Sequence, residues 1–296
     1  MGRILSGGNL ANLFEISICG EPFEALLRKR KELFAYLTPI PKQAIRRMEW
    51  VVDYDGTVGL TACLNSEITR QSLAGISRSI KLPILADQQA MAMLDLRCWR
   101  HTVRVDSRKG LSLYIERDWE PHLLRALCSW FDSSRALADS AIDFTSRSDF
   151  VVAIVGIHWR QQGSPRLRLY VVATPPHGEW RMCMEELSSI LPTTQAGCEA
   201  PYLAQLLRKP RRACLINLEA LDSHIGFKIE LPDVTRCELT PLLNLSKPST
   251  MLAALLPTTC DRLTYLGIRF RNGKPTSSTF YLSTQPEERS CGLRMS

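Results

Sequence analysis

The chain has 296 residues, of which 45% are hydrophobic and 23% are charged, so it can bury a large core in one large domain or in two. This composition excludes intrinsic disorder and a coiled coil as the main structure. The formal net charge of +7 favours an anionic partner, and nucleic acid, a membrane surface and a phosphorylated small molecule all qualify.

Five β-hairpins separated by amphipathic helices are predicted along the chain. The hairpins follow from alternating apolar and polar residues on both sides of turn signals such as Asp55-Gly56 and Asn272-Gly273. The helices follow from apolar residues at helical spacing. In chain order the predicted elements are a helix over 21–37, a hairpin over 48–64, a helix over 66–80, a hairpin over 97–117, a helix over 120–142, a hairpin over 150–174, helices over 180–191 and 200–209, a hairpin over 212–231, a helix over 240–256 and a hairpin over 262–282.

The turn centres fall near 55, 108, 163, 222 and 273, roughly 50 to 60 residues apart, so the plan of the chain repeats. Ten antiparallel strands with helices between the hairpins favour a sheet closed into a barrel, because closure removes exposed strand edges. The helices would then coat the outside. The alternative is an open antiparallel α+β sheet in two halves.

Strand parity predicts which side chains face the inside of such a barrel. If helices cover the exterior, the apolar residues of each strand face outward and the polar residues face the lumen. The predicted lumen residues are Glu49, Asp53, Ser112, Tyr114, Glu116, Arg166, Arg168, Tyr170, Gly226, Lys228, Glu230, Tyr265, Gly267, Arg269, Arg271, Thr279 and Tyr281.

This predicted lumen holds cations, tyrosines and a few carboxylates. Arg and Lys around a cavity suit a polyanion such as a diphosphate, to whose oxygens Arg offers forked donors. Tyrosine rings in the same cavity could hold a carbocation by cation–π attraction and keep water away.

With these residues the sequence resembles the aromatic prenyltransferases of the ABBA, or PT-barrel, class, in which helices and a β-hairpin alternate five times. RLRLYVVAT, with Arg166, Arg168 and Tyr170, is similar to the strand by which indole dimethylallyltransferases hold a prenyl diphosphate. The chain length and the first hairpin, RRMEWVVDYDG with Glu49, are most similar to the cyanobactin peptide prenyltransferases. The resemblance implies one α+β barrel domain over 1–296, with ten strands around a solvent-filled lumen and an outer ring of helices. Residues 1–18 would be an N-terminal segment and 283–296 a flexible tail.

The resemblance also implies roles for the predicted lumen residues. Glu49 would orient or deprotonate the acceptor, while dimethylallyl or geranyl diphosphate ionises with help from positive side chains and Mg²⁺. The implied diphosphate-binding residues are Arg97, Arg104, Arg166, Arg168, Lys228 and Arg269; the implied cation shield is Tyr114, Tyr170, Tyr265 and Tyr281; the implied acceptor-binding residues are Glu49, Glu230 and Trp50. The sequence departs from relatives in GLTACLN, which has no basic residue, and at Ser112, so Arg97 or Arg104 would substitute.

The resemblance implies a peptide acceptor, which we expect to be macrocyclic. Two lumen carboxylates, Glu49 and Glu230, would suit an arginine guanidinium as the prenylated group. One alternative for Glu230 and two for the function stay open. Glu230 could instead form a salt bridge with Lys228 or Arg269, and the chain could prenylate small indoles or phenols, or bind prenyl or peptide ligands without turnover.

Other function classes have less support in the sequence. The basic residues alternate within strands and form no surface stripe, which argues against nucleic acid as the partner. The ten cysteines and five histidines lack zinc-ligand spacing, and no apolar run of 18 residues could span a membrane. We expect a cytoplasmic monomer with reduced thiols and no protein-held metal beyond the diphosphate-associated Mg²⁺.

Overall fold

A computed structural model describes eleven stretches of the chain and four single residues. These are 31–53, 57–64, 70–82, 100–129, 135–146, 150–163, 165–173, 213–220, 225–235, 262–271 and 274–283, with Arg28, Lys209, Arg211 and Glu238. The predicted helices over 180–191 and 240–256 lie outside the described residues, as do the predicted helix over 200–209 except for Lys209 and the turns at Asp55-Gly56 and Asn272-Gly273.

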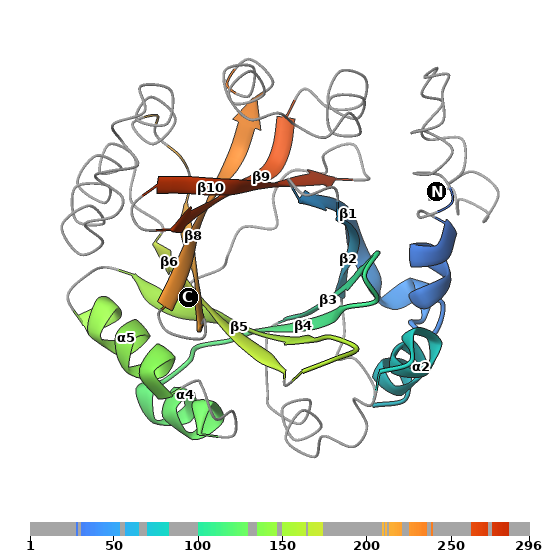
Figure 1. The fold of residues 1–296 in the computed structure, drawn as a ribbon, viewed down its shortest axis with the longest axis horizontal. Coiled ribbons are helices and arrows are strands. Elements are labelled where there is room, and N and C mark those ends of the chain that lie inside the picture. Colours follow the sequence, from blue (N-terminus) through green and yellow to red (C-terminus); the bar gives the residue numbers. More distant parts are fainter. Residues whose placement is uncertain are drawn as a thin grey trace, which may run out of the picture.

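Ten antiparallel strands form one closed barrel, which confirms the predicted fold class (Figure 1). Each strand pairs with its neighbours in the chain, and β1 pairs with β10 to close the ring. The strands are β1 (Ile45–Asp53), β2 (Val58–Leu64), β3 (Arg100–Asp106), β4 (Leu111–Glu116), β5 (Val151–Trp159), β6 (Arg166–Ala173), β7 (Cys214–Ala220), β8 (Ile225–Thr235), β9 (Arg262–Arg271) and β10 (Lys274–Ser283). A short 3-10 helix, η2 (Lys42–Ala44), precedes β1.

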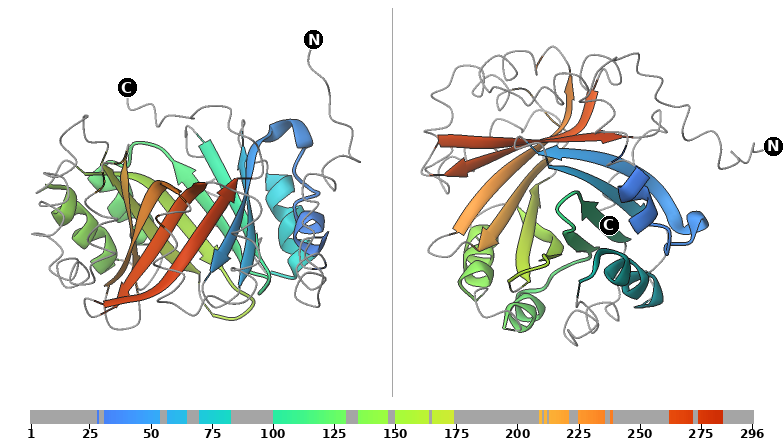
Figure 2. Two further views of the ribbon diagram at one scale, coloured as in Figure 1. Left: turned by 90° about the horizontal axis from the view of Figure 1, so that it is seen from above. Right: turned by 45° about the vertical axis from the view of Figure 1, so that its right-hand side comes forward.

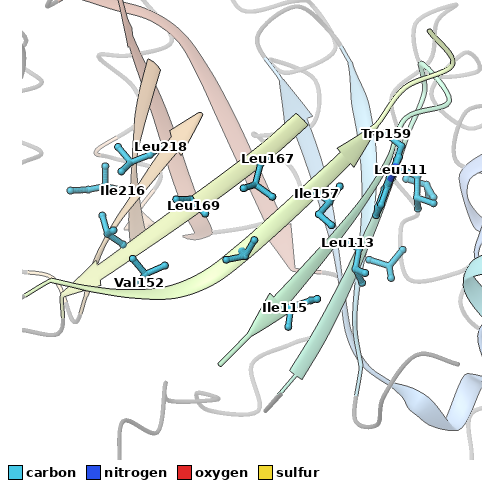
Figure 3. Packing of buried hydrophobic residues seen from close by; sticks show 14 of the residues in the cluster. Leu111, Leu113, Ile115, Val152, Ile157, Trp159, Leu167, Leu169, Ile216 and Leu218 are labelled. Atoms are coloured by element: carbon cyan, nitrogen blue, oxygen red, sulfur yellow. The ribbon is translucent and has the colours of Figure 1, made fainter. Parts of the chain in front are cut away.

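The hydrophobic core lies between the outer face of the barrel and the helices. Leu113, Ile157 and Leu169, which come from three neighbouring strands, project from the same face of the sheet (Figure 3). They share one cluster with Ile76 and Leu124 of the helices. The apolar parity of the strands therefore faces outward, as the sequence predicts, because burying it against helices removes it from water.

Helices α2 (Arg70–Ile80), α4 (Pro121–Cys128) and α5 (Arg135–Ser146) lie outside the ring of strands (Figures 1 and 2). Residues 31–36, within the predicted helix over 21–37, are also helical. Among the described parts of the chain, no helix is long and apolar enough to cross a bilayer.

The predicted single helix over 120–142 is wrong, because the structure has two helices there. The first ends at Cys128, where the backbone N–H of Ser129 donates to the carbonyl oxygens of Arg125 and Leu127. The second begins at Arg135, directly after Asp132-Ser133-Ser134 in the sequence. Asp and Ser favour helix N-termini because their side chains compete for backbone N–H groups, and the apolar periodicity does not register such an interruption.

Candidate active site

The polar parity of the strands faces the lumen, and many of its side chains are buried there. Glu49, Lys228 and Glu230 are each 5% exposed, although each carries an ionisable group. Each of them has an ion-pair partner on its own strand, and Lys228 and Glu230 also hydrogen-bond Tyr281 on β10, as buried charges require. The buried polar residues on the lumen face include Glu49, Thr61, Arg104, Asp106, Ser112, Glu116, His158, Asn217, Glu219, Lys228, Glu230 and Thr279.

Basic side chains from β3, β6, β8 and β9 gather in this lumen. Arg104 donates to Asp53 at 2.9 Å. Arg168 and Arg269 donate to the two oxygens of Glu219, at 3.3 and 2.9 Å. Of the expected diphosphate-binding residues, Arg104, Arg168, Lys228 and Arg269 thus lie in the lumen, and Arg166 lies opposite His158 at the start of β6. Arg97 lies outside the described residues.

Two neighbouring groups respond to the positive potential of this cluster. Burial and the charges of Arg168, Arg160 and Arg104 together lower the pKa of His158 to about 2. Burial raises the pKa of the Tyr114 phenol, while Arg168, Arg104, Ser112 and Lys228 lower it, and the net shift is downward. A phenol whose pKa falls in a buried site marks a place that favours an anion.

Arg168 has hydrogen-bonding capacity left for a ligand. Its Nε–H is buried and meets no acceptor among the described residues, while its Nη2 is held by Glu219. A buried donor without a partner is costly unless a ligand or water accepts from it. An anion with several oxygens, such as a diphosphate, would satisfy this donor.

The four expected shield tyrosines form two edge-to-face pairs. Tyr114 and Tyr170 have ring centroids 5.8 Å apart, and Tyr265 and Tyr281 have centroids 6.0 Å apart. The Tyr170 hydroxyl accepts from Asn217 at 3.0 Å, and the pKa of Tyr281 responds to burial, to Glu230 and to Tyr170, so the two pairs share the lumen. Their π faces supply the aromatic lining that cation–π stabilisation needs.

Glu49 projects into the lumen from β1, as its strand parity predicts. It accepts from Arg47, two residues earlier on the same face, and that pair has side-chain exposures of 31% for Arg47 and 6% for Glu49. Burial raises the pKa of Glu49, the guanidinium groups of Arg47 and Arg100 lower it, and Glu230 raises it. The net upward shift moves this carboxylate toward the range in which a general base works well.

Glu230 forms a salt bridge with Lys228, one of the two partners that the sequence analysis considered. Its carboxylate accepts from Lys228 Nζ at 2.5 Å and from the Tyr281 hydroxyl at 2.9 Å. Lys228 also donates to the Tyr281 hydroxyl at 2.8 Å. Glu230 is therefore a partner of the cationic cluster in this structure, and an acceptor guanidinium would have to compete with Lys228 for it.

Three glycines on the lumen face make room for these large side chains. A Cβ at Gly59 would lie 2.8 Å from Nε of Arg104, and one at Gly156 would lie 2.7 Å from the Tyr114 ring. A Cβ at Gly267 would lie 3.0 Å from Cδ of Lys228. Glycine at these positions lets the side chain on the next strand lie flat against the barrel wall.

Trp50 does not share the lumen with Glu49. Its ring packs edge-on against Phe34 at a centroid distance of 5.7 Å, and it contacts the hydrophobic core outside the barrel. Adjacent residues of a strand point to opposite faces, so the residue beside Glu49 in sequence cannot line the same cavity. Because the Trp50 ring lies outside the lumen, the acceptor-binding role expected for it is wrong.

The sequence did not single out several side chains that the structure brings into this site. Arg47 and Arg100 flank Glu49, Glu219 bridges two of the arginines, and His158 contacts Ser112, which the sequence already placed in the lumen. The signal for Glu219 was present in CLINLEA, where Asn217 and Glu219 share one parity, but Leu215 on the same face obscures the alternation.

The expected Mg²⁺ does not fit the donors that the described residues supply. Within the described ranges, no three His, Cys, Asp or Glu side chains gather in a way that could hold a metal ion. The lumen carboxylates Asp53 and Glu219 instead accept from guanidinium groups. In this site the positive charge facing an anion comes from Arg and Lys.

The fold is that of the ABBA, or PT-barrel, prenyltransferases. No protein-family model matches the sequence, and no curated protein sequence matches it. Among solved structures, a 6-dimethylallyl tryptophan synthase matches with a TM-score of 0.59 at 14% identity, covering 94% of each chain. The 5-dimethylallyltryptophan synthase from Streptomyces coelicolor matches with a TM-score of 0.56 at 12% identity, covering 94% of this chain and 95% of that one.

A third match is the 6-dimethylallyltryptophan synthase from Micromonospora olivasterospora in complex with DMASPP and Trp. Its TM-score is 0.52 at 13% identity, covering 94% of this chain and 95% of the other. The three proteins share the barrel with this chain along nearly its whole length. Their sequences are too distant to carry over more than the fold.

Proposed function

We propose that this chain is a prenyltransferase that binds an allylic diphosphate in the barrel lumen and transfers its prenyl group to a side chain of a peptide. The observation that carries the proposal is that Arg104, Arg168 and Lys228 share the barrel lumen with two tyrosine pairs. Cations suit the departing diphosphate, and aromatic rings suit the allylic cation left behind.

In the proposed reaction the cationic side chains bind the diphosphate, and the tyrosine rings surround the allylic cation. The C–O bond of dimethylallyl or geranyl diphosphate breaks, and its electron pair goes to the diphosphate held by Arg104, Arg168, Lys228 and Arg269. The tyrosine rings surround the cation and exclude water, so that an acceptor atom attacks it first. Arg166, at the start of β6, adds positive charge near Arg160, whose pKa is lowered first by burial and then by Arg166.

Glu49 acts on the acceptor. Its carboxylate is buried, and its upward-shifted pKa favours taking the proton that the acceptor loses as the new bond forms. The first hairpin, with a glutamate ahead of a short turn, is similar to that of the cyanobactin peptide prenyltransferases, and this likeness supports a peptide acceptor. A guanidinium acceptor would bind between Glu49 and Glu230 if it displaced Lys228 from Glu230.

A small indole is the second candidate acceptor. The solved relative in complex with DMASPP and Trp has the same barrel at 94% coverage of this chain, which favours an acceptor of that size. In both cases the chemistry in the lumen is the same, and only the acceptor differs.

One experiment separates these possibilities. Purified protein is incubated with dimethylallyl or geranyl diphosphate and one of four acceptors: cyclic peptides with a single Tyr, Trp or Arg, or free tryptophan. Products are followed by mass spectrometry. Transfer to a peptide supports the proposal, and transfer to arginine alone identifies the guanidinium; transfer to free tryptophan alone favours the small-molecule candidate.

Two variants tie any activity to the lumen. Arg168→Met removes a guanidinium that the proposal places on the diphosphate, whereas Arg125→Met removes an exposed guanidinium on α4 that pairs with Asp139. We expect the first variant to lose transfer and the second to keep it. Tight binding of inorganic diphosphate without turnover on any acceptor would favour a non-catalytic barrel, and failure to bind it would refute the proposed site.

A further inference from the structure

Arg47 and Arg100 lie on the lumen face, apart from the cationic cluster. Arg47 is the third residue of β1 and Arg100 is the first residue of β3, with β2 between the two strands (Figure 1). Neighbouring strands run antiparallel, so β1 and β3 both begin at the same rim of the barrel. Arg104 of the cationic cluster follows four residues after Arg100, a rise of about 13 Å along β3. The two arginines therefore form a separate basic pair at that rim.

Each arginine of this rim pair has its own carboxylate partner. Arg47 Nη2 donates to Glu49 Oε1 at 2.5 Å. Arg100 Nη2 donates to Oε1 of Glu116, which lies opposite it on β4. Burial raises the pKa of Glu49, and both guanidinium groups lower it, so both lie near the proposed base. The rim pair thus belongs to the part of the lumen where the acceptor would react.

Each guanidinium group nevertheless keeps one buried N–H without an acceptor. The Nε atoms of Arg47 and Arg100 are both buried, and neither meets a hydrogen-bond acceptor within the described stretches. The two side chains as a whole are 31% and 22% exposed, so they reach solvent at the rim. A buried donor without a partner is costly, and in folded proteins such donors are nearly always satisfied. These two N–H groups are therefore the donors that a bound ligand can satisfy at this rim.

The charge balance at this rim selects an uncharged acceptor for the two donors. With Glu49 and Glu116 ionised, the charges of the two ion pairs sum to zero. Cys63, the β2 residue opposite Arg47, adds no charge, because burial raises the pKa of its thiol. A phosphate or a further carboxylate would add an uncompensated negative charge to this partly buried site. The oxygen of a carbonyl group accepts an N–H without that cost.

The cationic cluster differs from the rim pair in its charge balance. There Arg168 and Arg269 share the single carboxylate of Glu219, so positive charge is in excess. The buried Nε–H groups of this cluster that lack an acceptor, on Arg104 and Arg168, therefore suit an anion such as a diphosphate. The two basic groups of the lumen thus differ in the ligand they suit, an anion at the cluster and a neutral group at the rim.

We propose that Arg47 and Arg100 bind main-chain carbonyl oxygens of the peptide acceptor through their Nε–H groups, and so present one of its side chains to Glu49. The inference rests on the proposed function of the lumen, and it names the part of the acceptor that is recognised. A peptide offers a neutral carbonyl at every residue, whereas a free amino acid at pH 7 offers only a charged carboxylate. Because β1 and β3 are about 10 Å apart, we expect the two arginines to bind carbonyls of different residues.

The first test needs no turnover. Arg47→Lys and Arg100→Lys each remove an Nε–H group but keep a positive charge for Glu49 and Glu116. Cyclic peptides with a single Tyr, Trp or Arg are titrated into each protein by calorimetry at pH 7, in the presence of inorganic diphosphate. We expect each variant to bind the tightest-binding peptide about tenfold to hundredfold more weakly than wild type, the size of a hydrogen bond to a charged group. Arg125→Lys, the same change at an exposed arginine on α4, should match wild type.

The second test changes the peptide and leaves the protein intact. Each peptide bond of the tightest-binding peptide is replaced in turn by an ester, whose carbonyl oxygen is a weaker acceptor and which lacks the N–H group. N-methylation of the same bond is the control, because it removes the N–H group and keeps the amide carbonyl. We expect two ester positions to weaken binding to wild type by at least about threefold. Each should have no such effect in one variant, Arg47→Lys or Arg100→Lys, and a merely structural role of either arginine would not produce this non-additivity.

Prenyl transfer and diphosphate affinity, measured on the same proteins, separate this inference from the proposed function. If the peptides bind as expected but no acceptor is prenylated, the transfer proposal fails and carbonyl recognition at the rim stands. Transfer to a peptide with equal peptide affinity in wild type, Arg47→Lys and Arg100→Lys would leave the proposed function intact and overturn the inference, with ordered water as the partner of both Nε–H groups. Absence of binding by all three peptides would also overturn the inference, and the affinity for inorganic diphosphate would still test the cationic cluster.

Discussion

Glu49 on β1 and Glu230 on β8 face one lumen from strands that are separated by β10 and β9. Burial raises the pKa of Glu49, and after the opposing effect of Arg47 and Arg100, the charge of Glu230 raises it again. Glu230 is held by Lys228 and Tyr281. Glu230 is thus paired with a cation of the lumen, whereas Glu49 is placed to accept a proton.

The Glu49→Gln variant should lose prenyl transfer by about 10²- to 10⁴-fold, because an amide cannot take the acceptor proton. Diphosphate affinity should be unchanged, since Glu49 does not contact Arg104 or Arg168. The wild-type rate should fall as pH drops through the raised pKa of Glu49, above its ordinary 4.5, and the variant should lack this acid limb.

Steady-state rates between pH 4.5 and pH 9 check the acid limb. Glu120→Gln on the exposed start of α4 serves as the matched control and should follow wild type. An acid limb that persists in Glu49→Gln would assign the base to another residue.

Strand parity was predictable from sequence because the period of a strand is two residues. Lys228, Glu230 and Tyr281 lie in the lumen as their alternation with Phe227, Ile229 and Phe280 predicts. The same rule places Trp50 on the face opposite Glu49, in conflict with the acceptor-binding role that the family resemblance implied for it. Proximity to Glu49 in the sequence suggested a shared site, but the pleat separates the two side chains.

The pairing of charges within the lumen was not predictable in the same way. Glu219 joins Arg168 on the neighbouring strand to Arg269 on β9, beyond β8. Such a contact depends on how the barrel curves and on the stagger between hairpins, and neither leaves a local pattern in sequence. The helix break after Cys128 was missed for a different reason, since apolar spacing continued on both sides of it.

The Glu219→Gln variant should be less stable than wild type by about 3–5 kcal/mol at pH 7, because it removes the carboxylate that pairs with the buried guanidinium of Arg168 and with the partly exposed Arg269. Burial raises the pKa of Glu219, but Arg168 and Arg269 lower it to about 2. A carboxyl group whose pKa is depressed in the folded protein stabilises the fold at pH values above its pKa in the unfolded chain, and this stabilisation is lost as the pH falls through the pKa of the folded state. The difference between the two proteins should therefore shrink as pH falls from about 4.5 toward about 2.

Urea unfolding at pH 7 and at pH 3 measures this difference. Glu238→Gln is the control, because the pKa of Glu238 is also held at about 2 but its partners, Lys209 and Arg211, belong to a different cluster. Only Glu219→Gln should alter diphosphate affinity, in the direction of tighter binding, since it frees positive charge in the lumen. Unchanged affinity in both variants would place the diphosphate elsewhere.

The Gly156→Ala variant should be destabilised by about 1–3 kcal/mol, because the new methyl group would overlap the Tyr114 ring. Adding Tyr114→Ala should recover much of this loss, since that change removes the ring that the methyl group meets. A double-mutant cycle of unfolding free energies measures the coupling, which we expect at about 0.5–3 kcal/mol. Additive effects would mean that the backbone at Gly156 moves aside and that the ring does not depend on this glycine.

Chelation of divalent metal should leave most of the transfer activity in place. The described carboxylates that face the cationic cluster already accept from guanidinium and ammonium groups, so Arg104, Arg168, Lys228 and Arg269 supply the charge that stabilises the departing diphosphate. We expect EDTA to lower the rate by less than about threefold in wild type. In Arg168→Met the remaining activity should depend more strongly on added Mg²⁺, because the metal can replace lost charge on the diphosphate. Complete loss of wild-type activity in EDTA, with full recovery on adding Mg²⁺, would show that these side chains alone do not suffice.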